Sequence, residues 1–249
     1  MTRTALQTHT LRPLEEPIDR KLDRAVDAGY EGVQFTPDLG HTTPANLLEQ
    51  VRARELEIAG CHVDRELLED DYEEAIEIYR TLDCSALVIS SYDPEAFESE
   101  AGIERAVSHL SELADRLAED GFTLHYHNHY FEFTDLGDRT GYEVFADLSD
   151  GAIRLEVDTG LAFYGGADPA ALIDRYADRI DLVHLTDTIP GSDETVHAEL
   201  GSGEVDLRAC VERSAAANVE WLIYENGRTD DPATSIVDAI DVMSELLES

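Results

Sequence analysis

Short apolar runs alternate with longer amphipathic stretches along almost the whole chain. The short runs have the length and residue types of buried strands, and the longer stretches carry apolar residues at helical spacing. Strands are therefore expected at residues 5–8, 32–35, 58–63, 86–90, 123–127, 154–157, 182–184 and 222–224. Helices are expected at residues 19–28, 44–54, 71–82, 103–119, 141–148, 169–176, 207–217 and 232–247.

Proline and glycine positions support these boundaries. Pro44, Pro169 and Pro232 lie in the first turn of a predicted helix, where proline costs no hydrogen bond. Gly29 follows the first predicted helix and Gly121 precedes the fifth predicted strand, as glycines that end helices do. Eight such repeats favour an α/β fold, a single-domain (β/α)₈ TIM barrel over residues 1–249. Neither GxGxxG nor GxxxxGK[ST] is present, which argues against dinucleotide and P-loop sites.

The chain is strongly acidic, with 55 acidic against 18 basic residues and a formal net charge of −37. The acids are scattered over the predicted helix surfaces between intact apolar runs, which distinguishes the chain from disordered acidic sequences. Such a surface is typical of a halophilic protein, because concentrated salt screens its self-repulsion. The same charge argues against a nucleic-acid partner, since phosphate contacts require basic patches.

The remaining composition points to the cytoplasm. The three cysteines show no CxxC spacing, which indicates a reducing compartment. No apolar signal region opens the chain, and no segment approaches ~18 continuous apolar residues, so we expect no membrane partner. Nothing in the sequence marks a subunit interface, and a homo-oligomer is left open.

Four consecutive predicted strands in the C-terminal half end on side chains that can bind a metal: His127, Asp158, His184 and Glu225. Each alone is more typical of a hydrogen-bonding residue at a strand end. Strand geometry allows each of the four to point into the barrel, and the carboxyl ends of barrel strands share one face. A mixed nitrogen and oxygen set suits one divalent metal ion, Mn, Mg, Co or Zn.

The motifs around these residues resemble the sugar phosphate isomerase/epimerase family, the xylose isomerase-like TIM barrels related to endonuclease IV. The resemblance rests on HNHYFEF from His127, EVDTG from Glu156, VHLTD from Val183 and ELGSGEVD from Glu199. It implies a metal-dependent isomerase or epimerase that acts on a small-molecule sugar or polyol. The reaction would proceed by proton abstraction beside a carbonyl, through a metal-stabilised enediolate.

The chain departs from the family pattern at the first ligand. Relatives present Glu, Asp, His and Glu from strands five to eight, and this chain has His127 in place of the first Glu. In the ketose 3-epimerases, the strand-five and strand-eight glutamates are also the acid/base pair, so that mechanism does not transfer intact. Glu132, Glu225 and His129 are the candidate catalytic residues. Glu132 could instead bond strand-end backbone, and His129 could instead orient a metal ligand.

Further residues are candidates for substrate binding. His62 ends the third predicted strand, and His197 and Glu199 lie in the long loop after the seventh, where barrel enzymes often build a substrate lid. The alternatives are a strand-end hydrogen bond for His62 and a solvated loop for the other two.

The sequence also suggests roles for two basic residues, Arg228 and Lys21. Arg228 could meet an anionic group of the substrate, although a pairing with Asp230 or Asp231 is favoured. Lys21 is the only lysine, and its place in the first predicted helix puts it away from the strand ends. A Schiff-base aldolase, which needs a lysine in the barrel, is therefore excluded.

Three other functions compete with the isomerase. A lyase on the same scaffold would dehydrate a keto-inositol or eliminate from a 3-keto-glycoside. It needs only one base and a separate acid, which suits the histidine at the first ligand position. DNA repair like that of endonuclease IV is disfavoured by the charge and the few ligands. The fourth possibility is a barrel that only binds a sugar.

Overall fold

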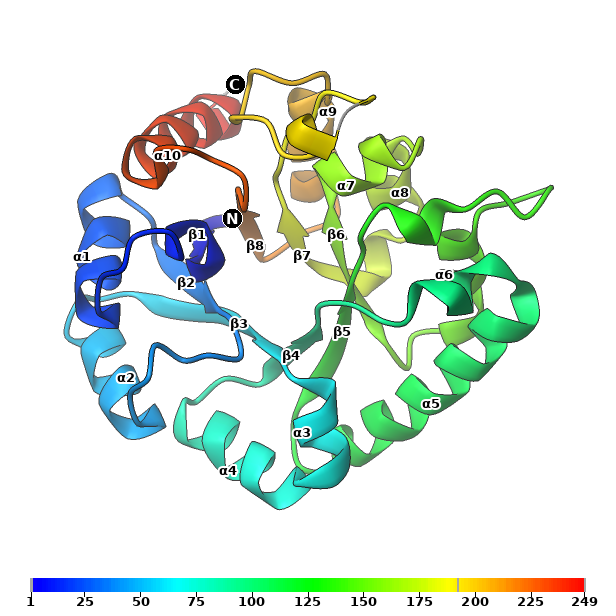
Figure 1. The fold of residues 1–249 in the computed structure, drawn as a ribbon, viewed down its shortest axis with the longest axis horizontal. Coiled ribbons are helices and arrows are strands. Elements are labelled where there is room, and N and C mark those ends of the chain that lie inside the picture. Colours follow the sequence, from blue (N-terminus) through cyan, green and yellow to red (C-terminus); the bar gives the residue numbers. More distant parts are fainter. Residues whose placement is uncertain (1, 192, 249) are drawn as a thin grey trace.

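Eight parallel strands close into a barrel in sequence order, and helices surround it (Figure 1). The computed structural model describes residues 2–191 and 193–248. The fold class predicted from the sequence is confirmed. The strands are β1 Arg3–Gln7, β2 Gly32–Phe35, β3 Glu57–Val63, β4 Ala86–Ile89, β5 Thr123–His127, β6 Arg154–Asp158, β7 Ile180–His184 and β8 Trp221–Tyr224.

The outer layer contains the predicted helices and two that were not predicted. The helices are α1 Ile18–Ala28, α2 Pro44–Arg52, α3 Arg65–Asp70, α4 Tyr72–Thr81, α5 Glu100–Glu119, α6 Gly141–Ser149, α7 Thr159–Tyr164, α8 Pro169–Arg175, α9 Leu207–Ala216 and α10 Pro232–Glu248. Short 3₁₀ turns add η1 Thr8–Leu11, η2 Pro94–Glu98, η3 Phe131–Phe133, η4 Ala177–Arg179 and η5 Asp193–Thr195. The unpredicted α3 and α7 have six residues each, too few to show helical periodicity.

The predicted helix boundaries are confirmed where proline and glycine set them. Pro44 and Pro169 occupy the first turns of α2 and α8, and Pro232 begins α10. Gly29 ends α1 in the left-handed conformation, at φ 105°. That conformation suits glycine because it has no Cβ to clash.

One end of the barrel interior is filled by apolar side chains. Ala5, Ala59, Val88, Leu182 and Trp221 belong to a small buried cluster, while the larger core lies between the strands and the helices. The other end, where the strands reach their carboxyl termini, carries polar residues instead. This division leaves room for a cavity at the face where barrel enzymes hold their active sites.

Strand register brings the polar residues of β5 to β7 together. His127 lies opposite Glu156 in the β5–β6 pair. The β6–β7 register shifts between Leu155 and Glu156, and Asp158 then lies opposite His184. The alternation that the sequence predicted therefore places donors from three neighbouring strands close together near the carboxyl end of the barrel.

We expect the stability of this acidic protein to depend strongly on salt. Raising KCl from about 0.1 M to about 1 M shortens the Debye length from about 10 Å to about 3 Å, which screens repulsion among the surface carboxylates. The free energy of unfolding, measured in urea at each salt concentration, should therefore rise. Glycerol at equal osmolality is the control. A free energy that does not change with KCl would contradict halophilic adaptation.

Candidate metal centre and active site

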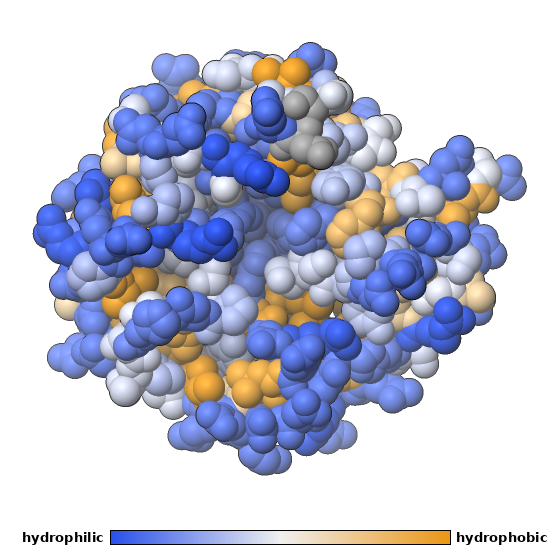
Figure 2. All heavy atoms as spheres, in the orientation of Figure 1, coloured by the Kyte–Doolittle hydropathy of each residue, from blue (hydrophilic) through white to orange (hydrophobic). Residues whose placement is uncertain are grey.

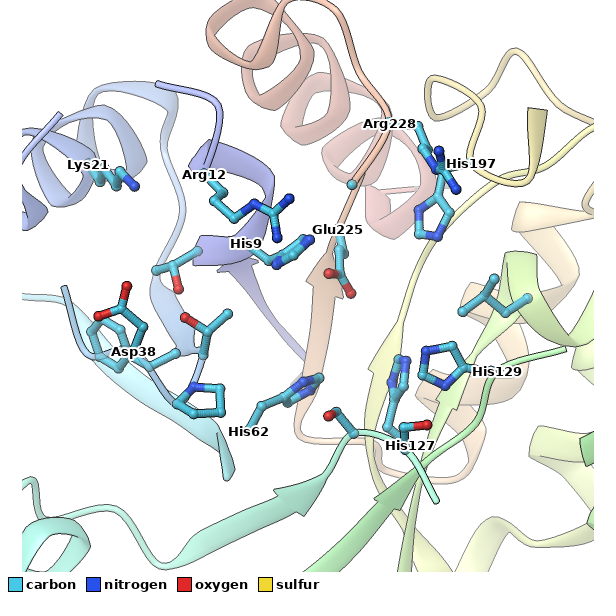
Figure 3. A pocket seen from close by; sticks show the side chains of 18 of the residues that line it. His9, Arg12, Lys21, Asp38, His62, His127, His129, His197, Glu225 and Arg228 are labelled. Atoms are coloured by element: carbon cyan, nitrogen blue, oxygen red, sulfur yellow. The ribbon is translucent and has the colours of Figure 1, made fainter. Parts of the chain in front are cut away.

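A cavity of about 750 Å³ opens at the carboxyl ends of the strands. Figure 2 shows it as a hollow at the centre of this face, surrounded largely by hydrophilic residues. The volume is in the usual range for small-molecule sites. Its lining includes polar side chains from several βα loops: His9, Arg12, Lys21, Asp38, His62, His127, His129, His197, Glu225 and Arg228. Figure 3 shows these side chains around the hollow.

The four predicted metal ligands come together at the floor of this cavity. His127, Asp158, His184 and Glu225 each offer a donor atom, and all four atoms lie within 4.8 Å of one another. His184 Nδ1 lies 3.0 Å from Glu225 Oε2 and 3.9 Å from Asp158 Oδ2. Because these residues come from β5 to β8 or directly follow them, the barrel itself sets their spacing.

Two of these donor atoms are buried without a hydrogen bond. Among the residues that the structure describes, Asp158 Oδ2 and His184 Nδ1 have no hydrogen-bond partner, and the 3.0 Å contact of Nδ1 with Glu225 is not aligned as one. The other Asp158 oxygen is satisfied by the Leu161 N–H at 2.7 Å and the Thr186 hydroxyl at 2.5 Å. A buried unsatisfied polar group costs about 1–3 kcal/mol. A divalent cation among these donors would satisfy both atoms, so the residues present fit the predicted metal.

Glu156 orients two of the histidines, a role that the sequence analysis missed. Its Oε2 lies 2.9 Å from His62 Nε2 and 3.1 Å from His127 Nδ1, and Gln34 donates to its Oε1. The bond to Nδ1 directs Nε2 of His127 away from Glu156, as expected when a carboxylate orients a metal-binding imidazole. The sequence signal was present, because Glu156 is in phase with Asp158 on β6.

A second set of residues is also close enough to hold a metal, namely His62, His127, Glu156 and His184. In that set the carboxylate already accepts hydrogen bonds at both oxygens. The set that contains Asp158 and Glu225 has the unsatisfied atoms instead. The candidate metal centre is therefore the predicted one, and Glu156 supports it.

Charges at the centre favour one positive charge among the carboxylates. Burial opposes ionisation of His184, but Glu156, Glu225 and Asp158 raise its pKa to about 9. Burial lowers the pKa of His127 to about 3, because its effect is larger than that of the hydrogen bond with Glu156, which raises the pKa. Burial alone would raise the pKa of Glu156, yet the imidazoles around it hold that pKa well below its usual value. A protonated His184 or a bound cation can supply the positive charge.

The structure places the two candidate catalytic residues that follow β5 in different environments. His129 lines the cavity, with its ring centroid 5.4 Å from that of His127. Glu132 is fully buried and accepts hydrogen bonds from the Tyr126 hydroxyl at 2.8 Å and the His129 N–H at 2.9 Å. Tyr126 belongs to the core between the barrel and the helices, and Glu132 is not among the cavity-lining residues. This placement corresponds to the alternative for Glu132, an acid bonded to strand-end backbone.

Burial of Glu132 predicts a pH-dependent stability. Burial raises its pKa to about 7, so between the ordinary value and pH 7 the folded protein holds a proton that the unfolded chain releases. Stability therefore falls as pH rises through this window, by about 3 kcal/mol at most. Urea unfolding at fixed high salt should show that Glu132→Gln removes this part of the pH dependence. The exposed variant Glu212→Gln should keep it, and identical profiles for Glu132→Gln and wild type would contradict the assignment.

Of the three predicted substrate-binding residues, two line the cavity. His62 and His197 face it, and the His62 ring also stacks on His184 at 5.5 Å between centroids. Glu199 is exposed and is not among the lining residues. It accepts a hydrogen bond from Ser235 of α10 at 2.6 Å, so its contacts attach the loop after β7 to the outer layer.

The loop after β7 is held by Asp187. Its Oδ2 accepts hydrogen bonds from the N–H groups of Gly201 at 3.0 Å and Gly203 at 2.8 Å, and its Oδ1 accepts from Val205 at 3.1 Å. A Cβ at position 203 would lie 2.1 Å from Asp187 Oδ1, so only glycine allows this close approach. These contacts fix the segment that follows His197.

The predicted position of Lys21 and the pairing favoured for Arg228 are both wrong. Lys21 lines the cavity, because barrel helices start at the same face where the strands end and Lys21 lies in the first turn of α1. Arg228 also lines the cavity and makes no ion pair with Asp230 or Asp231 among the described residues. Asp231 instead accepts the Thr234 hydroxyl at 2.8 Å.

The fold and the site together define a class, a (β/α)₈ barrel with a buried cluster of possible metal ligands at the carboxyl ends of its strands. The chain belongs to the xylose isomerase-like TIM barrel family, whose model matches residues 22–246. The resemblance inferred from the motifs is thus confirmed, and the family is one of enzymes.

The names of individual similar proteins describe either a dehydratase or an isomerase/epimerase. The chain is 26% identical to an inosose dehydratase of Geobacillus kaustophilus, over 92% of this chain and 76% of that protein. It is 24% identical to an inosose dehydratase of Lacticaseibacillus casei, over 88% of this chain and 84% of that protein. A solved structure of a sugar phosphate isomerase/epimerase from Parabacteroides distasonis superposes with a TM-score of 0.79 at 18% identity, covering 98% of this chain and 94% of that one. At that identity the last likeness shows the fold alone.

No helix in the described parts of the chain combines the length and apolarity that crossing a membrane requires.

Proposed function

We propose that this protein is a divalent-metal-dependent lyase that removes water from a keto-polyol. The observation that carries the proposal is the shortage of carboxylates at the site. Among the described residues, Glu225 and Asp38 are the carboxylates of the cavity lining. Glu132 lies outside that lining and accepts a hydrogen bond from the Tyr126 hydroxyl. Epimerisation with two carboxylate bases needs one on each face of the substrate, whereas elimination needs a single group that moves a proton. The similarity to inosose dehydratases supports the same choice.

His127, Asp158, His184 and Glu225 would hold the metal ion. When bound there, the ion would polarise a substrate carbonyl and thereby acidify the neighbouring C–H bond. Glu156 contributes by fixing the ring of His127 through Nδ1. His62 lines the cavity beside this centre, and we assign it a contact with a substrate hydroxyl.

His129 is the group that we assign to proton transfer. Its ring stacks on Phe131 at 5.5 Å between centroids, and Glu132 holds its backbone N–H. A neutral His129 takes the proton from the carbon beside the carbonyl and passes it to the hydroxyl on the next carbon. The C–O bond then breaks, water leaves and a C=C bond remains, so protons and electrons balance on one imidazole.

The products decide between the lyase and its alternative. Protein reconstituted with Mn²⁺ should convert a keto-inositol to a product lighter by one water, as detected by mass spectrometry. A product of unchanged mass and altered stereochemistry would overturn the lyase and favour an isomerase or epimerase. That second function has support in His129 and Glu225, two proton-accepting groups that both line the cavity.

Substitutions of His129 and Glu225 should differ in their effects on rate and on metal content. His129→Gln is expected to lower kcat by about 10²–10⁴-fold while the metal content stays at the wild-type value. Glu225→Gln is expected to lower both kcat and metal content, because it removes a ligand. If His129→Gln turns over like wild type, the proton transfer belongs to another group.

A further inference from the structure

We propose that the substrate of this site carries an anionic group, a carboxylate or a phosphate ester, which three cations at the cavity mouth bind. The inference rests on the proposed function only for the position of the carbonyl at the metal centre. The cations are Arg12, Lys21 and Arg228, and all three line the cavity.

The cations of the cavity lining differ from most others of the chain in having no ion pair. With 55 acidic residues against 18 basic ones, an arginine on this surface readily meets a carboxylate. On α1, the helix that carries Lys21, Arg24 bonds Glu16 at 2.7 Å and Arg20 bonds Asp23 at 3.1 Å. In the described part of the chain, no ion pair involves Arg12, Lys21 or Arg228.

The three cations come from neighbouring parts of the barrel. Arg12 follows η1 after β1, Lys21 lies in the first turn of α1, and Arg228 follows β8. Strands β8 and β1 pair directly, so these segments lie on one side of the opening. Figure 3 shows the three side chains along one edge of the cavity, with Glu225 between them and the histidines His62 and His127.

The two carboxylates that act on Lys21 each contact another side chain. Burial lowers the pKa of Lys21, and Asp38 and Glu16 are the carboxylates that oppose this effect. Both oxygens of Glu16 accept hydrogen bonds from Arg24, each at 2.7 Å, and Asp38 lies 3.4 Å from His41 Nδ1. Arg12 and Arg228 are exposed, so their guanidinium groups can meet an anion without prior loss of a partner.

This arrangement fits a substrate that spans the cavity. One end would present its carbonyl to the metal centre on the floor, and the other end would place its anionic group at the mouth. Guanidinium groups suit both carboxylate and phosphate, because their parallel N–H donors match two oxygens of either group. A neutral keto-polyol such as a keto-inositol would still present its carbonyl to the metal centre, but it would leave the three positive charges unused.

Binding of unreactive analogues tests this proposal without any turnover. The probes are sorbitol, gluconate and sorbitol 6-phosphate, which are a neutral polyol, its carboxylate and its phosphate ester, all without a carbonyl. Calorimetry uses the metal-reconstituted protein at the lowest KCl concentration that keeps its circular dichroism spectrum native. At least one anion should bind about tenfold or more tightly than sorbitol, since hydrogen bonds to charged groups are stronger than those between neutral groups. The better anion identifies the group.

Substitutions test whether the three cations cause the preference for an anion over sorbitol. Arg12→Gln, Lys21→Gln and Arg228→Gln together should bring the anion down to the affinity of sorbitol. The control is Arg105→Gln, an exposed arginine on α5 outside the cavity lining, which should leave the preference intact. Equal affinity for all three probes in the wild type, or a preference that survives the triple variant with a native spectrum, would overturn the proposal. Because no step is catalysed, these outcomes are independent of whether the lyase reaction itself is observed.

Discussion

Replacing Asp158 and His184 together by Asn and Gln is expected to abolish metal binding and activity. The wild-type protein, purified and reconstituted in high salt, should hold about one divalent ion per chain, as a site of this ligand number does. The double variant should hold none, because it loses the two buried donors that have no other partner. Loss of the ion should lower kcat/KM roughly a thousandfold or more, which corresponds to about 4 kcal/mol of transition-state stabilisation. Metal analysis of the purified protein and steady-state kinetics are the measurements.

Two further variants separate metal binding from folding. Asp158→Asn alone keeps the oxygen that accepts the Leu161 N–H, so α7 retains its cap while the charge at the centre is lost. Asp174→Asn on the exposed surface of α8 is the matched control and should change neither metal content nor rate. A wild-type protein that binds no divalent ion after reconstitution would remove the basis of the proposed reaction.

Glu156→Gln should destabilise the protein and weaken its metal binding at the same time. The substitution removes a buried carboxylate whose Oε2 lies 3.3 Å from His184 Nε2, an imidazole whose pKa is raised to about 9, and 3.1 Å from His127 Nδ1. Breaking a buried charged pair costs about 3–5 kcal/mol. Loss of the carboxylate that orients a metal-binding histidine lowers metal affinity by about 10–100-fold. Urea unfolding at fixed high salt and metal titration measure the two effects.

A matched surface variant isolates the contribution of burial. Glu212 is an exposed glutamate on α9, and Glu212→Gln should change stability by less than about 0.5 kcal/mol. If Glu156→Gln loses stability but binds metal with wild-type affinity, Glu156 is purely structural. The role assigned here, orientation of His127, would then be wrong.

The strand pattern was predictable because each strand is an apolar segment buried on both faces. The bounds of β2 and β5 coincide with the expected spans, and most other strands differ by one or two residues at an end. Short elements such as α7 were missed because they depend on tertiary contacts. Asp158 caps that helix and also bonds Thr186 from the neighbouring βα loop. Six residues of helix provide no periodicity that could have replaced this information.

What the sequence by itself determined is the barrel and the meeting of four candidate metal ligands on its floor. Alternation along a strand decides which residues share a face, and parallel strands bring their carboxyl ends to one side, so His127, Asp158, His184 and Glu225 were predictable. Only the tertiary structure decided the rest of the site. Gln34 meets Glu156 across the barrel, from a position 122 residues away in the chain. Lys21 turned out to face the cavity. Such contacts depend on how loops and distant strands are placed in three dimensions, and the local pattern of residues does not contain that placement.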